Sequence, residues 1–235
     1  AVLDARTGAL LEGREPQVPQ PPASVAKAMT ALYALERLGD GHRFATRLVG
    51  SGQVSGGRLS GDLILTGTGD PTLTSDGLAD LAAALRGRGI TRISGRFLVH
   101  GGALPQIGAI AGDQPDHVGY NPAISGLNLN YNRVHFEWKR AGQGGWQVSM
   151  DARGERVVPQ VRMARMRVVD RQAPLYTYAS EGRQENWTVA AAALGRGGSR
   201  WLPVRQPALY AGEVFQTLAR AQGITLPDPQ VLGGG

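Results

Sequence analysis

The chain has 235 residues, 42% hydrophobic and 19% charged, and no cysteine, which indicates a globular protein of one or two domains without disulfides or cysteine-ligated metals. Its net charge of +6 suits an anionic partner, but the arginines are scattered without alternating aromatic residues, so we expect a solvated basic face and no nucleic-acid binding. There is no run of 18 apolar residues, so we expect no membrane span, and the first residues lack the pattern of a signal peptide.

The first elements expected along the chain are a hairpin and a helix. Residues 2–4 and 9–12 flank a turn that contains glycine, which predicts two antiparallel strands. After a proline-rich loop, residues 24–38 are predicted to form a helix that ends at Gly39. This helix is apolar on nearly every side, and such a helix is expected to be buried.

For the next segment, the sequence predicts short strands around one helix. Strands are predicted at 46–49, 58–59 and 62–65, and a strand pair or bulged strand at 92–99. Between them, residues 78–85 carry a leucine stripe at helical spacing, and Asp76 is expected to cap that helix. The order predicts a strand–helix–strand unit with a buried leucine face.

The remaining chain is predicted to be mostly strand. Residues 101–126 are rich in glycine and proline and are expected to be irregular, whereas 127–205 alternate between polar and apolar residues. A final helix is predicted at 210–222, ended by Gly223, and the tail 231–235 looks cut rather than finished. The expected fold class is therefore α+β, with mixed α/β parts.

Ser24 and Lys27 are the first candidates for chemistry. Lys27 is one of only two lysines among 25 basic residues, and it lies three positions after Ser24, which places both on one helix face. The alanines around Lys27 are expected to desolvate it, and burial disfavours the ammonium form, so Lys27 is a candidate general base for a Ser24 nucleophile. The alternative is that Ser24 only caps the helix and Lys27 is an ordinary surface lysine.

Several segments resemble one family of enzymes. Pro22–Lys27, continued by Thr30–Leu32, looks like the active-site helix of penicillin-recognising serine enzymes, whose signature is S-x-x-K. Further segments resemble the class C low-molecular-mass penicillin-binding proteins, the D-alanyl-D-alanine carboxypeptidase/endopeptidases: Gly61–Leu65, Gly67–Leu73, Leu127–Asn132 and Pro207–Gly212. The resemblance runs from about residue 1 to residue 230.

This resemblance implies an architecture. Residues 1–46 would be the N-terminal part of a transpeptidase domain, formed by the hairpin and the active-site helix. Residues 47–235 would be a large inserted region of mostly β structure. We expect two small domains in that region, one from 47–102 with 186–235 and the other from 103–185.

The resemblance also implies a function, a serine D-Ala-D-Ala carboxypeptidase with possible endopeptidase activity. Ser24 would attack the D-Ala carbonyl, Lys27 would accept its proton, and Asp113 would meet the free amine of the peptide's diamino acid. The partners would be peptidoglycan peptides and β-lactams, the location periplasmic or otherwise extracytoplasmic, and neither a metal nor an organic cofactor is expected. The resemblance says nothing about the oligomeric state.

Two motifs of that family are missing from the sequence. No serine is followed two positions later by asparagine, and Lys139, the other lysine, precedes Arg140, so neither S-x-N nor K-T-G is present. We therefore expect the chain to lack the C-terminal half of the catalytic domain and to be catalytically incomplete alone. A non-catalytic cell-wall binding or scaffold module remains an alternative, and a serine β-lactamase ranks below it because β-lactamases usually lack so long an insertion.

Overall fold

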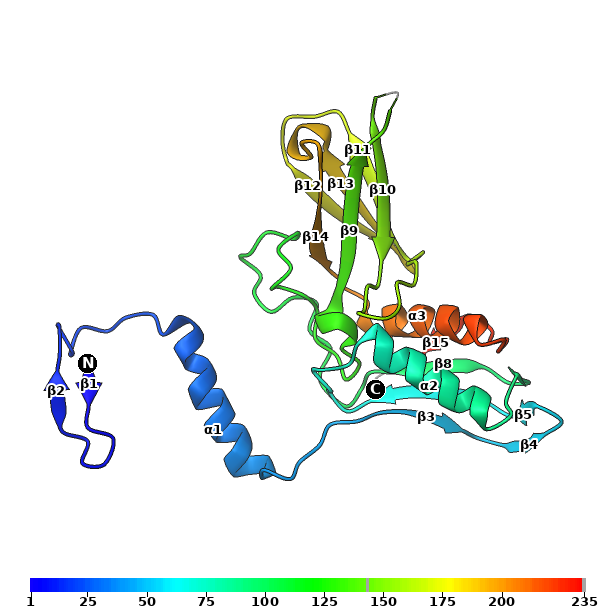
Figure 1. Ribbon diagram of the computed structural model, residues 1–235, viewed down its shortest axis with the longest axis horizontal. Helices are drawn as coiled ribbons and strands as arrows, with labels where there is room; N and C mark the ends of the chain where they lie inside the picture. The colour runs from blue at the N-terminus through cyan, green and yellow to red at the C-terminus, as the bar shows by residue number, and fades with distance from the viewer. Residues whose placement is uncertain (143, 234–235) are drawn as a thin grey trace. The chain divides into compact units, whose positions relative to one another are not determined.

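The computed structural model describes residues 1–142 and 144–233. Its internal contacts divide the chain into a first unit, Ala1–Arg43, and a second unit, Phe44–Gly235 (Figure 1). The mixture of several sheets with few helices agrees with the expected α+β class.

The first unit contains the predicted hairpin and helix. Strand β1 (Val2–Leu3) pairs antiparallel with β2 (Leu10–Glu12), so the hairpin prediction is confirmed. A short 3₁₀ turn, η1 (Ala23–Val25), leads directly into helix α1 (Ala26–Leu38). Gly39 follows with φ +80°, a conformation that glycine adopts without steric cost, and it ends the helix as predicted.

Helix α1 is exposed, so the prediction that it is buried is wrong. None of its residues is buried, and large apolar side chains stand in solvent, with Met29 69% and Leu32 60% exposed. The physical reason is the lack of a partner within the unit. A helix buries its apolar side against another layer, and residues 1–43 supply only two short strands.

The second unit contains a four-stranded sheet in the order β15-β8-β6-β3. Its strands are β3 (Thr46–Gly50), β6 (Leu63–Gly67), β8 (Phe97–His100) and β15 (Pro229–Val231). Strand β3 runs antiparallel to β6, whereas β8 is parallel to both β6 and β15. A smaller sheet beside it has the order β4-β5-β7, from β4 (Gln53–Ser55), β5 (Arg58–Ser60) and β7 (Arg92–Ile93).

Helix α2 (Ser75–Gly87) connects the parallel strands β6 and β8, which confirms the strand–helix–strand prediction. Its cap differs from the expected one. The hydroxyl of Thr74 accepts the N–H of Gly77 and caps the helix, while Asp76 lies inside the first turn and accepts backbone N–H groups of residues 155–157. The prediction that Asp76 caps the helix is therefore wrong, because its carboxylate accepts hydrogen bonds from a loop that is distant in the sequence.

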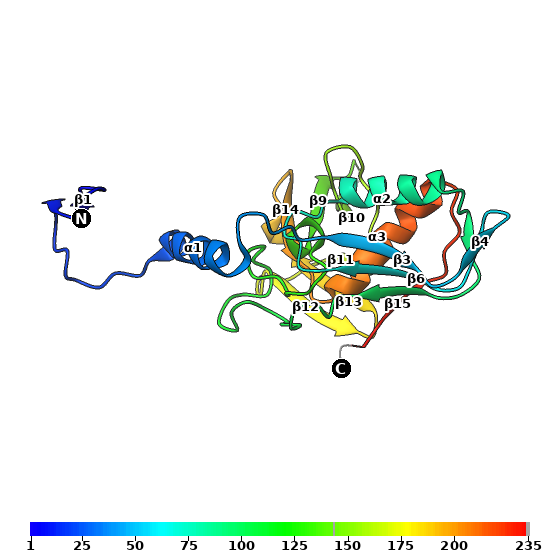
Figure 2. The same cartoon turned by 90° about the horizontal axis from the view of Figure 1, so that it is seen from below.

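One part of the core lies between this sheet and helix α3 (Pro207–Ala221), which packs against α2, β8 and β15 (Figure 2). The same buried cluster continues into the strands between residues 133 and 203. Alternate residues of β6 are buried, as the period of a strand requires, whereas Phe97, Leu98 and Val99 of β8 are all buried. Phe97 of β8 and Phe215 of α3 meet with their ring centroids 5.6 Å apart, and both are 0% exposed. This contact anchors the last helix of the chain onto the sheet.

Two further three-stranded sheets fill most of 127–205, as predicted. One has the order β10-β9-β14, from β9 (Arg133–Arg140), β10 (Trp146–Asp151) and β14 (Gly197–Pro203). The other has the order β11-β13-β12, from β11 (Ala164–Val169), β12 (Tyr176–Glu181) and β13 (Gln184–Ala190). Short 3₁₀ turns lie at η2 (Leu129–Asn132) and η3 (Ala191–Ala193), and 101–126 contains no helix or strand.

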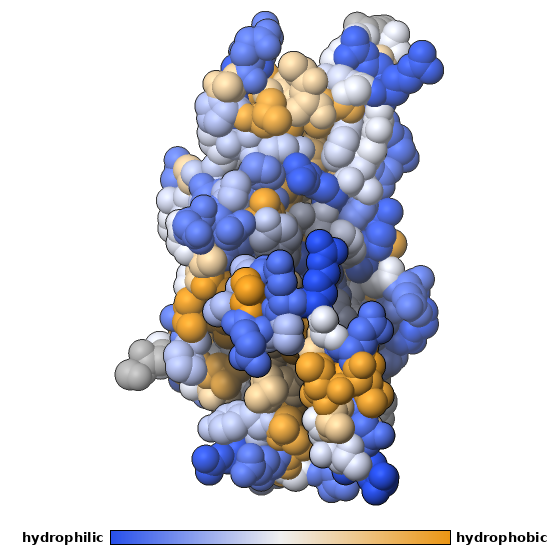
Figure 3. Space-filling view, turned by 90° about the vertical axis from the view of Figure 1, so that its left-hand side faces the viewer, coloured by the Kyte–Doolittle hydropathy of each residue, from blue (hydrophilic) through white to orange (hydrophobic). Residues whose placement is uncertain are grey.

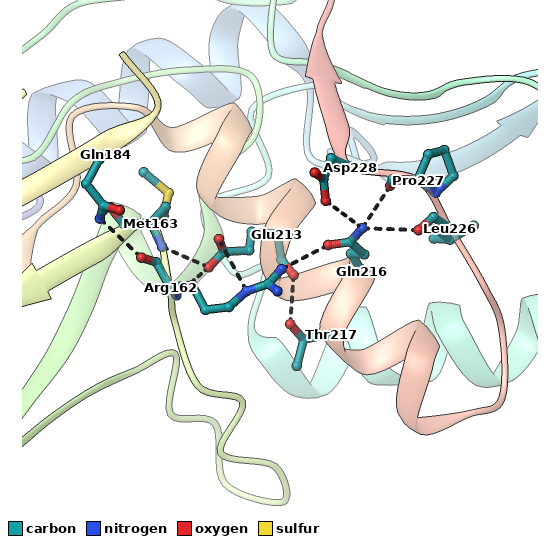
Figure 4. A network of polar contacts seen from close by, with 9 residues as sticks. All are labelled: Arg162, Met163, Gln184, Glu213, Gln216, Thr217, Leu226, Pro227 and Asp228. Atoms are coloured by element: carbon teal, nitrogen blue, oxygen red, sulfur yellow. Dashed lines mark hydrogen bonds and ion pairs between the residues drawn. The ribbon is translucent and has the colours of Figure 1, made fainter. Parts of the chain in front are cut away.

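A polar network joins the start of β11 to helix α3 and to the segment before β15 (Figure 4). The carboxylate of Glu213 accepts the backbone N–H groups of Arg162 and Met163. The side chain of Gln216, 3% exposed, accepts from Arg162 and donates to the carbonyls of residues 226 and 227. One helix thus satisfies backbone groups of two otherwise separate segments.

On the face drawn in Figure 3, hydrophobic side chains form separate patches between hydrophilic ones. The described part of the chain includes no helix with the length and apolar character needed to cross a membrane.

Candidate active site

The structure brings Ser24 and Lys27 together. Ser24 lies in the turn η1 and Lys27 in the first turn of α1, so the helical path places their side chains on one face. The Nζ of Lys27 donates a hydrogen bond to the Oγ of Ser24 at 2.9 Å. This distance lies within the reach that proton transfer between a nucleophile and its base requires.

The backbone in front of Ser24 is unusual. Ala23 has φ +45°, in the left-handed region that a residue with a Cβ rarely adopts. Neither η1 nor α1 has a side-chain cap, so Ser24 does not act as the helix cap. The serine hydroxyl at this helix start is instead used by Lys27.

Both side chains are exposed in this structure, so the expected desolvation of Lys27 is wrong. The neighbouring alanines are too small to shield a long side chain, and the first unit has no second layer to cover it. The arrangement therefore supplies the hydrogen bond between the two groups, and it does not supply the low-dielectric surroundings in which a lysine side chain readily becomes neutral.

Asp113 belongs to the second unit and is exposed in the irregular stretch 101–126. Its neighbour Asp116 is tied to the fold, because the carbonyl oxygen of Asp116 accepts from Nη2 of Arg205 at 3.1 Å. Arg205 also donates to the carbonyls of Gly108 and Asn121, so one guanidinium hydrogen-bonds three backbone carbonyls of this stretch.

Two features of the second unit were not found from the sequence. One is Glu185, 0% exposed, whose burial raises the pKa of its carboxyl to about 7 although it accepts the N–H groups of Arg205 and Gln206. The alternation of β13 could have indicated it, because Glu185 shares a strand face with buried Trp187. The other is the stack of Arg133 on the rings of Tyr131 and Trp201, two residues that lie 70 positions apart in the sequence.

In the described ranges, no three histidine, aspartate or glutamate side chains are grouped so that they could hold a metal ion.

Comparison with known proteins places these features in a family. The model of the D-Ala-D-Ala carboxypeptidase 3 (S13) family matches residues 1–233. The D-alanyl-D-alanine carboxypeptidase of Actinomadura sp. (strain R39) is 26% identical over 253 aligned residues, which cover 99% of this chain and 45% of the relative. The D-alanyl-D-alanine carboxypeptidase DacB of Haemophilus influenzae is 42% identical over 77 residues, 33% of this chain and 16% of the relative.

The fold is similar to that of a solved structure as well. Penicillin binding protein 4 (dacB) from Haemophilus influenzae matches with a TM-score of 0.69 and 25% identity over 91% of this chain and 48% of that chain. A second structure of the same protein, complexed with a β-lactam, matches with a TM-score of 0.62. The chain spans less than half the length of these relatives.

Proposed function

Since the chain belongs to the D-Ala-D-Ala carboxypeptidase 3 (S13) family, we propose that it contributes to a serine D-Ala-D-Ala carboxypeptidase that acts on peptidoglycan peptides and is acylated by β-lactams. The observation that carries the proposal is the 2.9 Å hydrogen bond between Lys27 Nζ and Ser24 Oγ. The pair lies at the start of a helix, in a segment that matches the S-x-x-K signature.

In the proposed reaction, Ser24 Oγ attacks the carbonyl carbon of the penultimate D-alanine. Lys27 in its neutral form accepts the hydroxyl proton as the new C–O bond forms. The C–N bond to the terminal D-alanine then breaks, and the proton passes to the leaving amine. Water hydrolyses the acyl-serine and regenerates the hydroxyl. The dipole of α1, positive at its N-terminus, favours the negative charge that develops next to Ser24.

The proposal includes further assignments. Asp113 would bind the free amine of the substrate's diamino acid, which its exposed carboxylate suits. Endopeptidase activity on the same peptides would use the same acylation step. The substrate implies a periplasmic or otherwise extracytoplasmic location.

We also propose that residues 1–46 begin a transpeptidase domain and that 47–235 form two small inserted domains. Strand pairing supports a boundary after β14 rather than at residue 185. Strand β14 pairs with β9, and β13 pairs with β11, so residues 184–203 share sheets with the segment 103–185.

Mass spectrometry after benzylpenicillin treatment of the full-length protein tests the assignment of Ser24 and Lys27. We expect one penicilloyl adduct on the peptide that contains Ser24. A Ser24→Ala variant should form no adduct, and Lys27→Met should acylate roughly 10²–10⁴-fold more slowly. Thr30→Ala, on the same helix, is the matched control and should acylate normally. An adduct that persists in Ser24→Ala would refute the proposal.

A further inference from the structure

The backbone around Tyr131 is strained. Asn130, Tyr131 and Asn132 have φ values of +51°, +59° and +52°, so three consecutive residues with side chains occupy the left-handed region. Asparagine tolerates this region, but tyrosine is an outlier there. Such conformations persist only where the surrounding structure fixes them, and they concentrate at functional sites.

Buried hydrogen bonds fix this turn from both ends. The side chain of Asn130 accepts the N–H of Ser75 at 3.2 Å and donates to its Oγ at 3.0 Å. The side chain of Asn132 donates to the Oδ1 of Asn128 and to a backbone carbonyl, both at 2.8 Å. Between these two buried asparagines, Tyr131 is 60% exposed. The strained turn therefore holds a large aromatic ring in solvent.

Arg133 lies between that ring and a second one. Its Cζ is 5.0 Å from the centroid of Tyr131 and 5.3 Å from the centroid of Trp201. Stacked rings cover the faces of a guanidinium and leave its N–H groups pointing outward in the plane. The Nε of Arg133 is buried without a hydrogen-bond partner, and its side chain forms no hydrogen bond or ion pair with any described residue.

The stack separates two hollows of the surface. Tyr131 and Arg133 line both a hollow of about 530 Å³, shared with Tyr120, and one of about 450 Å³, shared with Arg153 and Trp201. Each hollow has the size of a small-ligand site. A ligand in either hollow would meet an aromatic face and the edge of the Arg133 guanidinium.

The other charges of the smaller hollow are already paired or exposed. Arg153 forms ion pairs with two carboxylates, Glu137 and Asp151. Asp76 accepts three backbone N–H groups, and Glu155 is exposed. Arg133 is therefore the charged group of this hollow whose side chain has no acceptor among the described residues, whereas Arg153 lacks one only at its buried Nε.

We propose that Tyr131, Arg133 and Trp201 form a binding site for a carboxylate of a peptidoglycan stem peptide. A carboxylate accepts two parallel N–H bonds from a guanidinium, which matches the open edge of Arg133. The adjoining aliphatic part of the peptide would pack on the exposed ring of Tyr131. The identity of the ligand rests on the proposed function, because that function supplies the polymer whose peptides carry such carboxylates.

Calorimetric titration of the Ser24→Ala chain tests the site. The probe is acetyl-L-alanyl-γ-D-glutamyl-glycinamide, which has one free α-carboxylate, and its partner is the same peptide with an α-carboxamide. Loss of a charge-assisted bond predicts that the carboxylate binds about tenfold more tightly than the amide. Equal affinity of the two peptides, or equal affinity of a neutral N-acetylglucosamine oligomer, would overturn the proposal.

Variants locate the site. Arg133→Met should weaken binding of the carboxylate peptide about tenfold and remove its preference over the amide, and Arg133→Lys should lose part of that preference. Arg200→Met is the matched control, because Arg200 also stacks on a ring, that of Tyr176, but lines neither hollow. Unchanged binding in both Arg133 variants would refute the site. Because Ser24→Ala cannot be acylated at residue 24, this result is independent of the penicillin test.

Discussion

Helices α1 and α3 are both mostly apolar, but one is exposed to solvent and the other is buried. Helix α1 has 13 residues and helix α3 has 15. In α1 no residue is buried, whereas α3 is buried along nearly its whole length between α2, β8 and β15. The difference shows that an apolar sequence makes burial of a helix favourable, whereas the burial itself occurs only where other elements of the fold pack against the helix.

The contrast matters for function because the Ser24–Lys27 pair lies on the exposed helix. An isolated helix of about 12–15 residues is marginal in water, and most helix stability in proteins comes from packing. The two side chains meet through local helix geometry alone. Their reactivity, by contrast, depends on desolvation that the first unit does not provide.

Amide hydrogen exchange measured by mass spectrometry gives the largest expected difference between the two regions. Amides of α1 should exchange with protection factors near those of an unfolded peptide, because local opening there costs almost nothing. Amides in the central strands β9 and β13 should be protected by roughly 10³-fold or more. Equal protection of α1 and β9 would contradict the conclusion that α1 is unpacked.

Truncation of apolar side chains should separate the two regions next. Phe97→Ala removes a 0% exposed ring packed on Phe215 and should lower the free energy of unfolding by about 3–5 kcal/mol. Leu32→Ala in α1, at a side chain 60% exposed, should change it by less than about 0.5 kcal/mol. Tryptophan fluorescence during urea unfolding measures Phe97→Ala, since all four tryptophans lie in the second unit, and far-UV circular dichroism, which also detects helix α1, measures Leu32→Ala. A large effect of Leu32→Ala would show that α1 is packed in solution.

Two carboxyl groups show how the two regions also differ in their pKa values. In the first unit, hydrogen bonds from Thr7 lower the pKa of exposed Asp4, whereas in the second unit burial raises the pKa of Glu185 from 4.5 to about 7. Folded protein therefore binds the Glu185 proton more tightly than unfolded protein. The stabilisation is complete below pH 4.5 and is lost as the pH rises through 7.

Glu185→Gln should remove that loss. Relative to the parent chain, the variant should gain about 3 kcal/mol in free energy of unfolding between pH 4.5 and pH 8. Urea unfolding at the two pH values measures it. Glu181→Gln, at an exposed position of the same hairpin, is the control and should change little. An identical pH dependence in Glu185→Gln and the parent chain would contradict the assignment.

A smaller gain in stability is expected from replacing the strained residue Tyr131. Tyr131→Asn replaces a residue that is strained at φ +59° by one that tolerates the left-handed region, and it should raise the free energy of unfolding by about 0.5–1 kcal/mol. Tyr120→Asn, at a ring 70% exposed outside the strained turn, should leave stability nearly unchanged. Thermal unfolding of both variants measures the difference. Destabilisation by Tyr131→Asn would mean that the ring contributes to packing rather than to binding.

Much of the local structure follows from the sequence. The hairpin, the helix from residue 26, the strand–helix–strand unit and the last helix were all predictable from periodicity, glycine stops and short-range spacing. The approach of Ser24 to Lys27 belongs to this group, since three positions along a helix suffice to bring two side chains together. The cap of α2 was mispredicted because Asp76 hydrogen-bonds a loop almost 80 positions away.

Most helices and strands, the Ser24–Lys27 pair and the family resemblance could be predicted from the sequence, because all three depend on neighbours within a few positions or on short motifs. The burial of α3 but not α1, the raised pKa of Glu185 and the stack of Tyr131, Arg133 and Trp201 became known only from the folded chain. These features depend on surfaces contributed by distant parts of the chain. Burial and long-range contact are properties of such surfaces, and no local pattern of residues specifies them.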